Sequence, residues 1–107
     1  MNKEKLVLNN RKLDIKYCTR FKDKLLGFMF QKNINYILKF KCKSIHTFFM
    51  KENIDVVITD KHNKVIHIFN NLKKNQIIIK LDSYFIYELP FNTNVYKVGD
   101  KLKIEKC

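Results

Sequence analysis

The sequence predicts a mainly β protein: a compact, single-domain β-sandwich or barrel-like fold with one or two short helical segments. The chain has 107 residues, which is the length of one domain. Its apolar residues come in short runs rich in Ile, Val, Phe and Tyr, the residue types that favour strands. Clusters of Asn, Asp and Lys separate these runs at intervals of roughly ten residues, a spacing typical of sandwiches and barrels. We therefore treat residues 1–107 as one domain.

Nine runs are expected to be strands with antiparallel neighbours. The clearest pair flanks the connection from Asp60 to Asn63, where Asn63 tolerates the left-handed conformation that such a connection needs. We therefore expect a hairpin between Ile54 and Phe69. In chain order, the nine runs are Lys5–Leu8, Leu13–Tyr17, Tyr36–Phe40, Ile45–Met50, Ile54–Thr59, Val65–Phe69, Ile77–Leu81, Tyr84–Leu89 and Leu102–Ile104.

Two segments depart from the strand pattern. Within Thr19–Met29, the apolar residues Phe21, Leu25 and Phe28 recur at the spacing of one helical face. A single helical turn is expected over Thr93–Val98, after the one proline of the chain. Both would be minor additions to a β body.

The charge of the chain is strongly positive, with 22 Lys and Arg against 10 Asp and Glu and a formal net charge of +12. Arg11 and Arg20 are the only arginines, although Arg is the residue that binds phosphates with a planar fork. The abundance of Lys, Asn, Ile, Phe and Tyr is typical of A/T-rich codons. A solvated lysine surface is therefore the favoured interpretation. Non-specific nucleic-acid binding through the Lys-rich N-terminal half stays open as an alternative.

Other patterns bear on location and on bound groups. The three cysteines, Cys18, Cys42 and Cys107, form no CxxC pair, which argues against a disulfide framework and against a zinc site. No run approaches the roughly 18 apolar residues of a membrane span, and the N-terminal run is too short for a signal peptide. The two glycines cannot build a phosphate-cradling loop. We expect a cytoplasmic domain with no membrane contact, no metal and no cofactor.

Four patches form an ordered pattern over about residues 13 to 105. They are Lys24–Met29, Cys42–Val57, Glu88–Pro90 and Val98–Asp100. The most specific reads C-K-S-I-H-T-F-F-M and then I-D-V-V, similar to C-x-x-[IV]-H-T-x-x-M and [IL]-D-V-V. In these patches the chain resembles the signal-less branch of the bacterial and archaeal family of domains of unknown function numbered 192. The resemblance implies a compact β-sandwich and supplies no function.

The patches supply the candidate site residues. His46 lies in an apolar strand, and a buried imidazole must place a ring nitrogen on a partner. Asp55 and Glu88 are carboxylates in similarly apolar settings. One interpretation is a pocket in which His46 accepts a proton or binds a ligand beside these carboxylates. The other is a polar clamp that fixes strand register and satisfies backbone donors of loops. The full candidate set is His46, Thr47, Met50, Asp55, Glu88, Gly27 and Lys24.

No complete catalytic constellation accompanies these residues. Cys42 and His46 are four residues apart, about 13 Å along a strand, which is too far for a nucleophile pair or for one metal ion. The sequence therefore favours a non-catalytic binding or accessory module with a small ligand or a protein as its partner. The alternatives are an enzyme with a pocket lined by His46, Asp55 and Glu88, and the nucleic-acid binder described above.

Overall fold

The computed structural model describes residues 3–19, 34–48 and 50–106. Each of the nine predicted runs overlaps a strand, and the mainly β prediction is confirmed. The described residues form no helix, and so no helix with the length and hydropathy of a membrane span is found among them. The strands are β1 (Glu4–Leu8), β2 (Arg11–Cys18), β3 (Ile37–Phe40), β4 (Ser44–His46), β5 (Ile54–Thr59), β6 (Val65–Leu72), β7 (Ile77–Ile79), β8 (Phe85–Pro90) and β9 (Ile104–Lys106).

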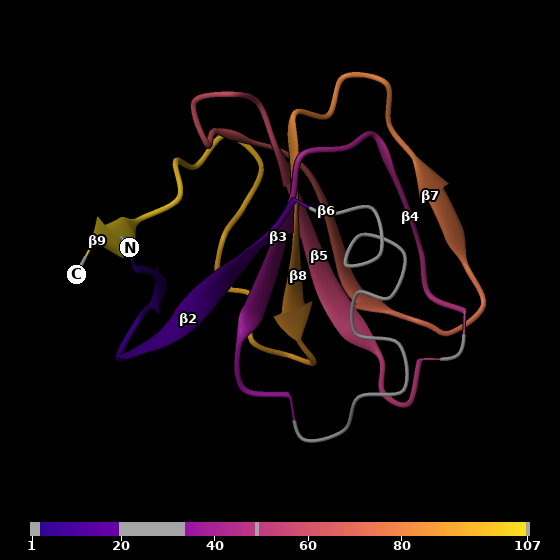
Figure 1. The fold of residues 1–107 in the computed structure, drawn as a ribbon, viewed down its shortest axis with the longest axis horizontal. Coiled ribbons are helices and arrows are strands. Elements are labelled where there is room, and N and C mark those ends of the chain that lie inside the picture. The colour runs from indigo at the N-terminus through magenta and orange to yellow at the C-terminus, as the bar shows by residue number, and fades with distance from the viewer. Residues whose placement is uncertain (1–2, 20–33, 49, 107) are drawn as a thin grey trace.

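Seven strands form the main sheet, in the order β6-β5-β8-β3-β2-β1-β9 (Figure 1). All neighbours in this sheet are antiparallel except β2 and β3, which run parallel. Antiparallel neighbours were expected from the sequence, and this prediction is wrong at the β2–β3 pair. A parallel pair needs a connection of a dozen or more residues, and the sequence between β2 and β3, residues 19–36, is long enough.

The two ends of the main sheet meet through the segment that leads into β9. The backbone N–H of Val65, at the start of β6, donates to the carbonyl of Asp100 at 2.8 Å. Gly99 donates its N–H to the Val65 carbonyl at 2.9 Å, and Leu102 donates to the Asn63 carbonyl at 3.0 Å. These bonds connect β6 to the chain just before β9 and give the sheet its barrel-like closure.

Each face of the main sheet carries an apolar cluster. The inner cluster contains Leu6, Leu8, Ile37, Val57, Val65, Tyr87, Leu89, Tyr96 and Leu102. The outer cluster contains Cys18, Leu38, Phe40, Met50, Ile54, Val56, Ile58 and Ile86. Strands β4 and β7 form a separate two-stranded sheet, and Ile45 and Ile78 of these strands pack on the outer cluster. Burial of a large apolar side chain contributes about 1.5–3 kcal/mol, so the two clusters stabilise the main sheet and its contact with the β4–β7 sheet.

Asparagine takes the place of glycine in the turns. The chain has two glycines, yet five non-glycine residues in the described part of the chain have positive φ, and all five are asparagines. The short polar side chain of Asn tolerates this left-handed region better than other side chains do. Asn63 is one of them, with φ 63°, as the sequence predicted for the connection between β5 and β6. The others are Asn9, Asn71, Asn75 and Asn92.

The helical turn expected over Thr93–Val98 is wrong. The backbone N–H of Asn94 donates to a side-chain oxygen of Asp55, and the N–H of Tyr96 donates to Oδ1 of Asn94 at 2.9 Å. Because side chains take these donors, the segment does not form a helical ladder. Gly99, with φ 97°, belongs instead to a β-turn in which the Asp100 N–H donates to the Lys97 carbonyl at 3.0 Å. The expected helix within Thr19–Met29 lies outside the described residues except for its first position.

Candidate functional site

Thr47 follows β4 directly and is buried. Its hydroxyl donates to the carbonyl of Lys73 at 2.7 Å and accepts the N–H of Gln76 at 2.8 Å. Its backbone N–H donates to the Gln76 carbonyl at 2.9 Å, and its carbonyl accepts the N–H of Asn75 at 3.1 Å. The polar groups of Thr47 are thus all engaged with the connection between β6 and β7. Thr47 is a clamp on the start of β7.

A second set of contacts fixes the chain just after β7. The ammonium of Lys43 donates to the carbonyl of Leu81 at 2.7 Å and to that of Ser83 at 3.3 Å. The backbone N–H of Lys80 donates to the Lys43 carbonyl at 2.8 Å, and the Ser83 hydroxyl donates to the Cys42 carbonyl at 2.8 Å. The signature stretch from Cys42 to Thr47 therefore holds both ends of β7.

His46 is the last residue of β4 and is half-buried. Its Nδ1 accepts the backbone N–H of Phe48 at 3.3 Å, and its ring stacks on that of Phe48 with centroids 5.2 Å apart. The carbonyl of Thr47 accepts the N–H of Met50 at 3.4 Å, so the chain turns here instead of continuing as a strand. The expected strand Ile45–Met50 is therefore too long. His46, Phe48 and Met50 do not share one strand face, and Met50 is buried in the outer cluster.

Asp55 lies in β5 and is 2% exposed. Its Oδ1 accepts the backbone N–H of Asn71 at 2.8 Å, and its Oδ2 accepts that of Asn94 at 2.9 Å. Each carboxylate oxygen thus satisfies a backbone donor from a different segment, one at the end of β6 and one after β8. The polar-clamp interpretation therefore holds for Asp55.

Glu88 is also buried, but it points to the other face of the sheet. In the pairing of β5 with β8, Asp55 lies opposite Leu89 of the inner cluster, whereas Glu88 lies opposite Val56 of the outer cluster. Residues opposite each other in a sheet share a face. A pocket lined jointly by His46, Asp55 and Glu88 is therefore not formed, and that prediction was wrong. Lys24 and Gly27 lie outside the described residues.

Lys39 is a buried lysine that is absent from the candidate set predicted above. It is 7% exposed, and its Nζ lies 4.1 Å from the ring centroid of Phe85, 5.2 Å from that of Tyr17 and 5.5 Å from that of Tyr87. Burial lowers the pKa of Lys39, and Glu4 acts in the opposite direction. A lysine inside the apolar run Tyr36–Phe40 was the available signal. The rings replace part of the lost hydration through cation–π attraction.

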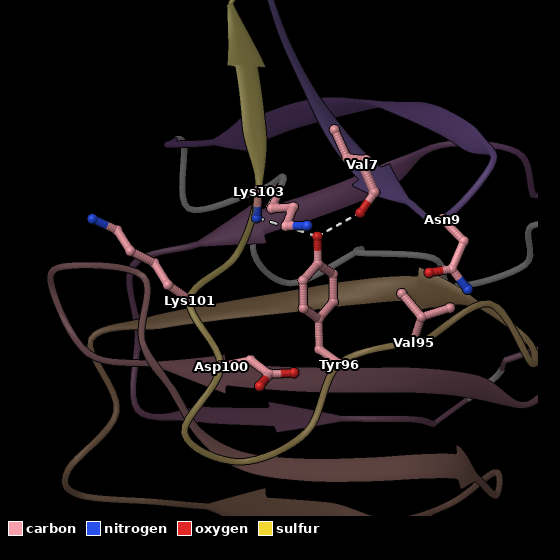
Figure 2. Close-up of a pocket in the computed structure, with 7 residues that line it drawn as sticks. All are labelled: Val7, Asn9, Val95, Tyr96, Asp100, Lys101 and Lys103. Carbon is pink, nitrogen blue, oxygen red and sulfur yellow. Dashed lines mark hydrogen bonds between the residues drawn. The ribbon is translucent and has the colours of Figure 1, made fainter.

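A pocket of about 440 Å³ lies beside Tyr96, where β1 meets the segment before β9 (Figure 2). The Tyr96 hydroxyl donates to the carbonyl of Val7 and accepts the N–H of Lys103 at 3.2 Å. The Tyr96 hydroxyl, the central polar group of the pocket, therefore links β1 to the segment before β9. The lining residues are Val7, Asn9, Val95, Tyr96, Asp100, Lys101 and Lys103, and they include a single carboxylate. The volume suits a small molecule, but the lining contains no acid–base pair.

The described ranges hold no group of three His, Cys, Asp or Glu side chains close enough to bind a metal ion. One acid–histidine pair is present. Nε2 of His67 lies 2.9 Å from Oδ1 and 3.0 Å from Oδ2 of Asp82. The hydrogen bond from His67 lowers the pKa of Asp82. The pair is exposed and joins β6 to the loop before β8, so it is a surface contact between neighbouring segments.

No protein-family model matches the sequence, and no curated protein matches it. Two solved structures are similar in fold. A proposed transcription regulator from Sinorhizobium meliloti 1021 has a TM-score of 0.80 and 12% identity, over 99% of this chain and 94% of that one. A protein of unknown function from Novosphingobium aromaticivorans DSM 12444 has a TM-score of 0.77 and 11% identity, over 94% and 83%. The fold is shared. At these identities the likeness concerns the fold alone.

Proposed function

We propose that the protein is a cytoplasmic, non-catalytic binding module of the family of domains of unknown function numbered 192, and that its binding surface is the β4–β7 layer. The observation that carries the proposal is the use of the signature stretch. The side chains of Lys43 and Thr47 form hydrogen bonds that fix the two ends of β7. The carboxylate of Asp55 accepts hydrogen bonds from two backbone N–H groups. Because these side chains are engaged in structural hydrogen bonds, they favour a role in holding a binding surface in place over a role in catalysis.

The alternatives have less support. An enzyme would need its acid, base and ligand groups around one cavity, but Asp55 and Glu88 point to opposite faces of the sheet. A nucleic-acid groove would need its lysines on one face. Lys16 and Lys39 lie opposite Leu38 and Tyr87, which belong to the outer and inner clusters respectively. The likeness in fold to a proposed transcription regulator does not change this balance, because it carries no residue-level match.

Site-specific photo-crosslinking tests the proposal. A photoreactive phenylalanine analogue is placed at Ile79 of β7 and, as a control, at Val98, which has nearly the same exposure (62% and 63%). After illumination in the producing cells, we expect a discrete protein adduct from position 79 and none from position 98. The adducted protein, once purified, should bind the unmodified module with an affinity that falls on substitution of Ile79. Adducts from position 98 alone, or turnover of a substrate lost in His46→Ala, would contradict the proposal.

A further inference from the structure

β7 has one hydrogen-bonded neighbour among the strands described here, β4. The backbone N–H of Lys80 donates to the carbonyl of Lys43, the residue before β4. The Gln76 carbonyl accepts the N–H of Thr47, the residue after β4. Ile78, midway between Gln76 and Lys80, is opposite Ile45. The backbone groups of Gln76, Ile78 and Lys80 therefore face β4.

Consecutive residues of a strand direct their N–H and C=O groups to alternate edges. Ile77 and Ile79 therefore point these groups away from β4, toward the outer edge of the two-stranded sheet. Figure 1 shows β7 at the periphery of the molecule, with β4 between it and the main sheet. An edge of this kind can pair with an extended segment of another chain.

The same two residues also present their side chains to solvent. Ile77 is 60% exposed and Ile79 is 62% exposed, whereas Ile78 packs on the outer cluster. Leu81, which follows, is even more exposed and extends this apolar row. β7 thus combines backbone hydrogen-bonding groups at its outer edge with apolar side chains on its solvent-facing face. An extended peptide is the ligand whose backbone satisfies the former while its alternate side chains cover the latter.

β7 is anchored by hydrogen bonds at both of its ends. Thr47 fixes the connection that enters β7, and Lys43 fixes the loop that leaves it through the carbonyls of Leu81 and Ser83. A strand held at both ends loses little freedom on pairing, so more of the interaction energy appears as affinity. The hydrogen bonds made by Lys43 and Thr47 therefore hold β7 in the extended conformation that strand pairing needs.

We propose that β7 binds an extended segment of a partner protein, which adds to the β4–β7 sheet as a third strand. This inference rests on the binding function proposed above. The segment carries apolar residues at alternate positions and acidic residues at its flanks. The acidic character follows from the exposed Lys73 and Lys74 before β7 and from the net charge of +12. A second copy of this chain carries the same charge and is disfavoured as the occupant.

Amide hydrogen exchange tests the geometry on the unmodified protein. The probe is a synthetic peptide of alternating valine and threonine with glutamates at both ends. In the free protein, the Ile78 amide should exchange slowly, while the amides of Ile77 and Ile79 exchange readily. Addition of the peptide should slow exchange at Ile77 and Ile79 and leave Ile78 slow. A peptide that fails to bind, or that binds without protecting these two amides, would overturn the proposal.

Matched substitutions provide the second arm. Ile79→Thr keeps the β-branched shape and removes apolar surface from the edge, so the peptide affinity should fall about tenfold. Val98→Thr changes an equally exposed residue outside the edge and should leave the affinity unchanged. A peptide flanked by lysines should bind more weakly than the acidic one, and equal binding would remove the charge argument.

The two proposals fail separately. Crosslinks from position 79 without peptide protection would keep the binding module and reject strand addition. Protection of Ile77 and Ile79 by rising protein concentration alone, with a dimer in analytical ultracentrifugation, would identify a second copy as the occupant and overturn the assignment to a different protein.

Discussion

Strands β5 and β7 lie in different layers and differ in almost every respect that matters for stability. All six residues of β5 are buried, and it pairs on both edges, with β6 and with β8. β7 has three residues, of which the outer two are exposed, and its described pairing is to β4 alone. β5 stabilises the core of the main sheet, whereas β7 contributes little to that core. Stability and interaction surface are therefore separated in this molecule, which allows β7 to stay apolar without being part of a core.

A pair of isoleucines gives the largest expected contrast. Ile58 in β5 is 0% exposed, and Ile58→Ala should lower the free energy of unfolding by about 4 kcal/mol, through lost apolar transfer and a residual cavity. Ile77→Ala in β7 removes a side chain that solvent already reaches, so its cost should stay within about 0.5 kcal/mol. Urea unfolding of both variants measures the difference. Equal losses would mean that β7 belongs to the core after all.

Asp55 is expected to give the next largest effect. Asp55→Ala leaves the backbone donors of Asn71 and Asn94 without their acceptor at a partly buried site, and each such donor costs about 1–2 kcal/mol. The total loss in the free energy of unfolding should be about 3 kcal/mol. Asp55→Asn retains one acceptor oxygen and should lose about half as much. An unchanged stability in both variants would contradict the clamp.

Thr47 should have a smaller and more local effect. Thr47→Val keeps the shape but removes the hydroxyl between Lys73 and Gln76, at a cost of about 2 kcal/mol. Amide exchange should accelerate over residues 73–79 while β5 and β8 keep their protection. Thr93→Val, which removes a hydroxyl with one bond to Pro90, is the control and should leave β7 unaffected. Uniform acceleration across the molecule would show that the clamp is not specific to β7.

The strands could be predicted from the sequence because each is a local pattern. A run such as I-D-V-V-I-T shows its type through β-branched residues and its limits through flanking Asn and Asp. The site could not be predicted in the same way. Alternation shows which residues of one strand share a face, but not whether Asp55 and Glu88, from strands distant in sequence, share one. That answer needs the register of β5 with β8, which places them on opposite faces.

The same limit applies to the clamps. The role of Thr47 depends on a connection that returns to it from residues 73–76, and the role of Asp55 depends on Asn71 and Asn94. No local sequence pattern predicts these hydrogen-bond partners, because they are distant in the sequence. The composition did contain one signal that could have been used further. With only two glycines in the chain, most left-handed turns were to be expected at asparagines, and two of the five found among the described residues, Asn71 and Asn75, donate a backbone N–H to a clamp residue.

A substitution of Tyr87 in the core is expected to have the smallest effect on the free energy of unfolding. It lies in β8 within the inner cluster, and its hydroxyl donates to Oδ1 of Asn63 at 2.5 Å. Burial raises the pKa of Tyr87 well above its ordinary value of 10.0. Tyr87→Phe should lower the free energy of unfolding at neutral pH by about 1 kcal/mol, because one hydrogen bond is lost and the ring stays in place.

The pH dependence of the same variant follows from the direction of that shift. Below pH about 10, tyrosine is protonated in both states, and the contribution of Tyr87 is complete. As the pH rises further, the unfolded state loses the proton while the folded state keeps it, so the wild-type protein is destabilised. Tyr87→Phe cannot titrate, and its stability should therefore fall less steeply above pH 10. Urea unfolding at neutral and alkaline pH compares the two slopes, and parallel slopes would place the Tyr87 hydroxyl in contact with water.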